Sequence, residues 1–174
     1  QTIFLSRRWH TSAQGLPRFE ALTGMIYAGL SLQGMEQHVA PAVKALARDC
    51  TREIDDTGGI PTRNPEELLE VLTLLTWTTA ALTESGHQPP AAIATAIARI
   101  TPTLRALRHA DGGLARFHGG GRGLIGRLDH ALAAAGDKTR PGDTLYMGFA
   151  RLSGGRTSIV IDAATPPVGP ASVN

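Results

Sequence analysis

The feature that most constrains the fold is a change in the spacing of apolar residues near residue 144. Before it, apolar residues recur at the spacing of amphipathic helices, in segments that are separated by glycine and proline. After it, residues 146–152 and 156–164 resemble two strands joined by a tight turn that contains glycine. The sequence therefore predicts a mainly α-helical chain that ends in an antiparallel β-hairpin.

Four long helices and one short helix are expected before this change. They cover about residues 16–33, 39–54, 64–86 and 89–109, and the short helix covers 124–135. Pro102 is expected either to kink the fourth helix or to restart it. Antiparallel helical hairpins with short loops suit an α/α toroid or solenoid better than a four-helix bundle, although the apolar spacing alone is compatible with both.

The start of the third helix is the clearest local signal in the chain. Asn64 is a strong N-cap, Pro65 suits the first helical position, and Glu67 completes a capping box. A helix cap is by itself a sufficient explanation for these residues, since they match the free amide groups and the dipole of a helix start. Arg63 lies directly before the cap.

A glycine-rich loop at 111–121 is the second notable segment. Its glycines allow the backbone to approach a ligand closely, and it carries Arg116, Phe117 and His118. Such a loop is either a binding loop or a flexible, solvated connector. Residues 7–10, with the sequence RRWH, are a further candidate contact for a carbohydrate or anion, or an amphipathic surface segment.

Composition and charge argue against several functional classes. Seventeen Lys and Arg residues against fifteen Asp and Glu residues leave a formal charge of +2, so nucleic acid is not an expected partner. No apolar run reaches the roughly 18 to 20 residues that cross a bilayer. The six histidines lack the spacing of metal ligands, and no metal or cofactor is expected. The single cysteine, Cys50, excludes an internal disulfide and is expected to be a core or half-buried residue.

Three blocks of the sequence together resemble a known family. They are RNPEELLE at 63–70, the glycine-rich loop at 111–121, and the predicted strand pair at 146–164. In this order they resemble the heparinase II/III-like polysaccharide lyases of bacteria. The resemblance implies that residues 1–137 are an α/α toroid segment and that residues 138–174 are the incomplete start of a β-sandwich domain. It also implies a periplasmic or cell-envelope protein.

The resemblance further implies β-elimination on glycans that contain uronate. Asn64 would neutralise the uronate carboxylate, and His118 would donate or accept the proton. Arg63, Arg116 and Asp111 would bind the substrate, an acidic polysaccharide or oligosaccharide. The segment alone would be inactive, and whether the full-length protein is an active lyase stays open.

Two alternatives remain at this point. The first is a non-catalytic glycan-binding or scaffold module with a degenerate lyase fold. The second is a glycoside hydrolase, for which Asp111 and Glu66 are the only carboxylate pair that the sequence suggests. In each case the hairpin presents unpaired edges and an apolar face, which predicts poor solubility or a homodimer.

Overall fold

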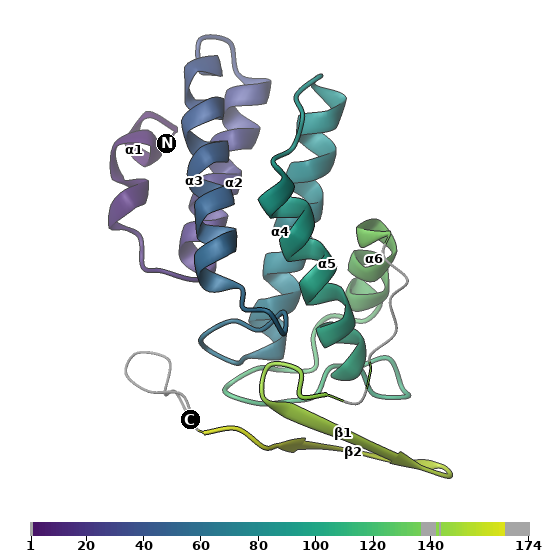
Figure 1. Cartoon of the computed structure of the whole chain (residues 1–174). Helices are drawn as coiled ribbons and strands as arrows, with labels where there is room; N and C mark the ends of the chain where they lie inside the picture. The colour runs from purple at the N-terminus through teal and green to yellow at the C-terminus, as the bar shows by residue number, and fades with distance from the viewer. Residues whose placement is uncertain (1, 137–141, 143, 166–174) are drawn as a thin grey trace.

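The computed structural model describes residues 2–136, 142 and 144–165 (Figure 1). Within these residues the chain is mainly α-helical and ends in a two-stranded antiparallel sheet, which confirms the predicted fold class. The helices are α1 (Thr2–Arg8), α2 (Leu16–Ser31), α3 (Val39–Glu53), α4 (Pro65–Glu84), α5 (Ala91–Ala106) and α6 (Arg127–Ala135), with 3-10 turns η1 (Trp9–Thr11) and η2 (Glu36–His38). The strands are β1 (Phe149–Gly154) and β2 (Thr157–Asp162).

The four long helices form two antiparallel pairs, α2 with α3 and α4 with α5 (Figure 1). Helix α2 also contacts α4, and α3 contacts α5, so the four contacts close a cycle. Helix α1 packs on α2, α6 packs on α4, and the hairpin lies across one end of the helices (Figure 1). The larger toroid and sandwich remain predictions. The expected domain boundary at 137/138 falls outside the described residues.

The core comes from the apolar stripes of these four helices. Helix α4 is buried over most of its circumference, as its sequence predicts, although Trp77 is 47% exposed. Cys50 is buried, and burial raises the pKa of its thiol to about 12, so it is a core residue as expected. Large, fully buried side chains pack between the helices, and the burial of each stabilises the fold by roughly 1.5–3 kcal/mol. They include Phe19, Leu22, Ile26, Leu46, Leu68, Leu72 and Leu75.

Helix α5 runs without interruption through Pro102 and does not restart there. A proline at this position removes the amide that would bond the carbonyl of Ala98. Ala98 lies on the exposed side of the helix, where water can satisfy that carbonyl. The helix ends at Ala106, about three residues before the predicted end. The N-terminal helix α1 was not predicted.

The hairpin has two different faces because side chains alternate along each strand. Its register pairs Phe149 with Asp162 and Leu152 with Ile159. Phe149 is buried against the helical part, whereas Leu152 and Ile159 are 56% and 51% exposed on the opposite face. Arg151 attaches the inner face to the end of α5, where its Nη1 donates to the carbonyls of Ala106 (2.9 Å) and Arg108 (2.6 Å).

Candidate functional site

Asn64 caps α4 as predicted. Its Oδ1 accepts hydrogen bonds from the backbone amides of Glu66 (2.9 Å) and Glu67 (3.3 Å). Its Nδ2 donates to Glu67 Oε1 at 3.5 Å, and the residue is 7% exposed. The side chain of Asn64 is therefore engaged in forming the start of the helix.

The glycine-rich loop is folded onto this helix start. The amide of Gly121 donates to Glu66 Oε2 at 2.7 Å. A Cβ atom on Gly120 would overlap Asn64 Oδ1, so only glycine fits at this close approach. The glycines are thus explained at these positions by packing against α4, and the loop is not a free connector.

Arg63 lies just before the cap and reaches the hairpin. Its Nε donates to the carbonyl of Met147 at 3.0 Å, its Nη1 donates to the carbonyl of Thr165 at 3.2 Å, and its Nη2 pairs with Asp162. The guanidinium lies over the ring of Phe149, 4.8 Å from the centroid. Arg63 is only 9% exposed, so these contacts hold a buried charge between the helices and the hairpin.

His118 of the glycine-rich loop reaches the same carboxylate. Its Nε2 lies 3.0 Å from Asp162 Oδ2. Phe117 stacks on Phe149 with ring centroids 4.4 Å apart. We call Arg63, His118, Phe149 and Asp162 the Arg63 cluster. It joins three segments that are far apart in the sequence.

The backbone is strained at this place. Among the described residues, the non-glycine positions with positive φ are Arg63 (52°), His118 (50°) and Met147 (52°). Two belong to the Arg63 cluster, and Met147 accepts a hydrogen bond from Arg63. Left-handed backbone at such residues costs of order 1–3 kcal/mol each and persists only where surrounding contacts hold it.

Asp162 is the electrostatic centre of the cluster. Burial alone would raise the pKa of its carboxyl. Hydrogen bonds from Arg63 and the amide of Ala164, the charge of Arg63, and the bond with His118 outweigh burial and lower that pKa. Asp162 therefore stays ionised through the neutral range and can accept from both Arg63 and His118.

Acid should weaken the attachment of the hairpin. A carboxyl whose pKa is lowered on folding stabilises the fold above its unfolded pKa, and this stabilisation is lost as the pH falls through the folded pKa. We expect the difference in unfolding free energy between the wild type and Asp162→Asn to be largest above about pH 5 and to shrink below about pH 4. Urea titrations across this range measure it, and a difference that stays constant with pH would contradict this role of Asp162.

A separate prediction concerns the contribution of the Asn64 cap to stability. Asn64→Ala should lower the free energy of unfolding by about 0.5–2 kcal/mol, because two amides at the start of α4 lose their acceptor. Asn64→Ser retains a capping oxygen and should cost less. Thermal melts of the two variants decide it, and an unchanged midpoint for Asn64→Ala would show that the cap contributes nothing.

The other predicted site residues lie apart from the cluster. Asp111 is exposed and pairs with Arg122 at 2.9 Å, and a hydrogen bond from the amide of Gly113 lowers the pKa of its carboxyl. Arg116 is exposed. The structure thus brings Arg63, Asn64 and His118 to one end of the helices and leaves the other two at the surface. The structure does not test the roles assigned to these five side chains.

Sequence reasoning missed Phe149 and Asp162, the hairpin residues that complete the cluster. One signal was available, because Asp162 is an acidic residue at the end of an apolar strand. At residues 7–10, Arg8 lies over the ring of Phe4 at 5.4 Å, and the rings of Trp9 and His10 are 6.1 Å apart. These contacts are within the N-terminal segment itself.

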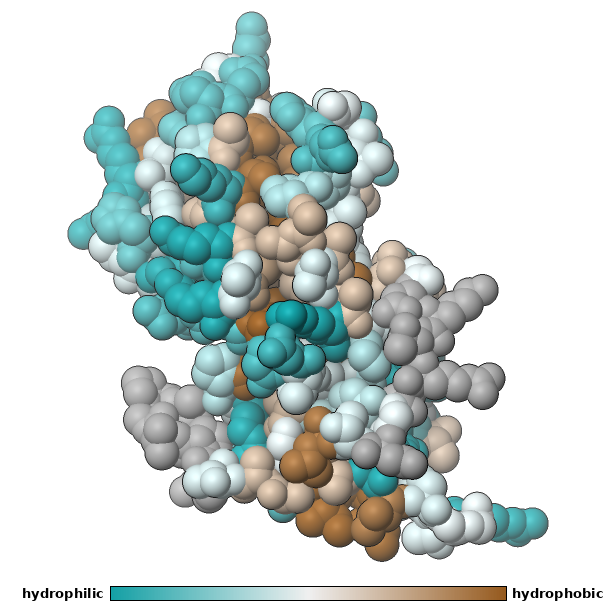
Figure 2. Space-filling view, viewed as in Figure 1, coloured by the Kyte–Doolittle hydropathy of each residue, from teal (hydrophilic) through white to brown (hydrophobic). Residues whose placement is uncertain are grey.

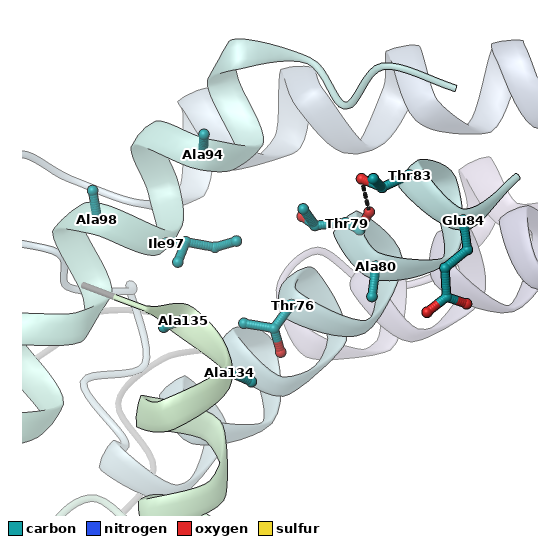
Figure 3. A pocket seen from close by; sticks show the side chains of 10 residues that line it. All are labelled: Thr76, Thr79, Ala80, Thr83, Glu84, Ala94, Ile97, Ala98, Ala134 and Ala135. Atoms are coloured by element: carbon teal, nitrogen blue, oxygen red, sulfur yellow. Dashed lines mark hydrogen bonds between the residues drawn. The ribbon is translucent and has the colours of Figure 1, made fainter. Parts of the chain in front are cut away.

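A hollow lies between α4, α5 and α6, apart from the Arg63 cluster (Figure 3). Its volume is about 470 Å³, and small side chains such as Thr76, Ala80 and Ala94 line it. Thr83 Oγ1 donates to the carbonyl of Thr79 at 2.8 Å, so this hydroxyl bonds within its own helix. Glu84 is the one charged residue in the lining, which offers no acid–base pair.

The described part of the chain has neither a metal-binding group of side chains nor a membrane-spanning helix. No group of three or more His, Cys, Asp or Glu side chains there could hold a metal ion. None of the described helices is both long enough and apolar enough to span a membrane.

Comparison with known proteins gives one informative match. The chain is similar to FtsZ-localized protein C of Caulobacter vibrioides. The two are 34% identical over 156 residues, which cover 88% of this chain and 26% of the relative. The chain therefore spans about a quarter of the length of that curated protein. No protein-family model and no solved structure matches the chain.

This match corrects the interpretation drawn from the three sequence blocks. The resemblance to heparinase II/III-like lyases is wrong, and so is the function of cleaving uronate glycans, because no lyase family matches and the relative is named for localisation with FtsZ. The periplasmic or cell-envelope location, which followed from the resemblance, is wrong for the same reason. The blocks have local explanations that are common to many folds: a helix cap, a glycine loop that packs on it, and a hairpin.

Proposed function

We propose that the chain is part of a cell-division protein that binds FtsZ. The observation that carries this proposal is the 34% identity to FtsZ-localized protein C over 88% of the chain. Identity over most of the chain favours a related role. The partner is then a protein rather than a polysaccharide.

The outer face of the hairpin is the proposed contact surface. Leu152, Ile159 and Ile161 alternate on this face and are 56%, 51% and 43% exposed. Figure 2 shows apolar residues gathered at the end of the molecule where the hairpin lies. A protein partner could cover this apolar face and add a strand to the edge of the sheet, which supplies both hydrophobic burial and main-chain hydrogen bonds.

The test is cosedimentation with FtsZ. The purified chain is mixed with FtsZ from the same organism, polymerised with GTP, and the pellet is compared with a pellet formed without FtsZ. We expect the chain to enter the pellet only with the polymer. If equal amounts pellet without FtsZ, the proposal is wrong.

A pair of variants tests the surface separately. Leu152→Ser combined with Ile159→Ser should reduce the bound fraction several-fold, because it removes the apolar face without altering buried residues. Leu124→Ser removes an apolar side chain that is 70% exposed elsewhere and should leave binding unchanged. Equal binding by the hairpin variant would place the contact on another surface.

A further inference from the structure

A cavity of about 550 Å³ opens between residues 13–16 and the connection from α3 to α4. It lies beside the start of α4, and none of its lining residues belongs to the hairpin. Its apolar walls are Leu16, Phe19, Ile60 and Val71. A volume of this size is within the range of small-ligand sites and has room for a large side chain.

The charged residues that line the cavity are both acidic, Glu53 and Glu67, and no Lys, Arg or His lines it. Arg52, outside the lining, pairs with Glu53 at 2.7 Å and offsets part of this negative charge. Glu67 already accepts from Thr62 Oγ1 at 2.8 Å and from Asn64 Nδ2 at 3.5 Å, so both of its oxygens are engaged. Glu53 is therefore the carboxylate with more capacity for a ligand.

Glu53 is placed to receive a cation. Its side chain is 7% exposed, and Oε1 accepts from Arg52 Nε at 2.7 Å. An ionised carboxylate has about four acceptor sites, so this bond leaves several unused. Glu53 also ends α3, where the negative end of the helix dipole adds to its attraction for a positive group.

We propose that this cavity binds the basic side chain of an extended peptide, with arginine as the best fit. The apolar stem of the side chain would pack on Phe19 and Ile60, and the guanidinium would donate to Glu53. Arginine combines the two properties that the cavity requires, an apolar stem and a charged, planar group that pairs with carboxylates. An anionic ligand would be repelled by both carboxylates. This site is independent of the proposed binding to FtsZ.

The probe is the peptide acetyl-Leu-Arg-Leu-amide, compared with the same peptide that carries citrulline, a neutral analogue of arginine with nearly the same shape. Binding is followed by shifts of backbone amide signals in two-dimensional NMR. We expect saturable shifts at Glu53, Ile60 and Thr62 with the arginine peptide. The citrulline peptide should bind about tenfold more weakly or worse, because it lacks the charge.

Three variants complete the experiment. Glu53→Gln should weaken arginine binding about tenfold, and Ala13→Trp should block the mouth of the cavity, where Ala13 is exposed. Glu84→Gln, in the hollow of Figure 3, is the matched control and should bind as the wild type does. If Glu53→Gln unfolds the chain, Ala13→Trp still tests the site, because it should prevent binding of the arginine peptide. Equal binding of both peptides, shifts elsewhere, or no saturation would overturn the proposal.

Discussion

Replacing Gly58 with alanine should lower the free energy of unfolding by about 3–5 kcal/mol. Gly58 has φ of 72°, and a Cβ atom there would overlap the backbone carbonyl of Arg99 on α5. The obstacle is the backbone of a packed helix, which cannot rotate away as a side chain could. The substitution must therefore either separate α5 from the turn after α3 or distort that turn.

Gly86→Ala is the matched control for this prediction. Gly86 has φ of 76°, but a Cβ atom there would meet nothing within 4 Å. It should cost only about 1 kcal/mol, from backbone strain alone. Urea unfolding of the two variants separates strain from overlap. Equal costs would show that α5 does not pack on Gly58 as the structure has it.

Replacing Arg63 with methionine should cost about 3–5 kcal/mol and release the hairpin from the helices. The variant loses hydrogen bonds to Met147 and Thr165 and leaves Asp162 without its main cation. Methionine fills a similar volume and suffers the same backbone strain at this position. The loss of unfolding free energy therefore measures the contribution of the charge of Arg63 and of its hydrogen bonds. Amide hydrogen exchange in β2 measures the release, and urea unfolding measures the cost.

Two comparisons make this second prediction specific. Arg116→Met removes an exposed arginine from the glycine-rich loop and should have little effect. Arg63→Met combined with Asp162→Asn should cost less than the sum of the two single changes, because no ionised carboxylate is then left without its partner. Additive costs would mean that Arg63 and Asp162 do not act as a pair.

The failure of the lyase interpretation has a physical explanation. Each of the three blocks that suggested it reports a local property: an amide-capping sequence, a need for backbone without Cβ, and alternation along two strands. Asn64 illustrates this, since its oxygen is taken up by the amides of Glu66 and Glu67. Similar local properties arise in unrelated proteins, so their order did not specify a reaction.

The sequence by itself determined helices α2 to α6, the N-cap at Asn64 and the two-faced hairpin, because these depend on neighbouring residues and on the periodicity of apolar side chains. Only the tertiary structure decided which residues meet. Asp162 meets Arg63 and His118, which lie 99 and 44 positions before it in the sequence. The cavity at Glu53 forms where residues 13–16 meet the α3–α4 connection. Such contacts depend on how whole elements pack, and no local pattern encodes the distance between them.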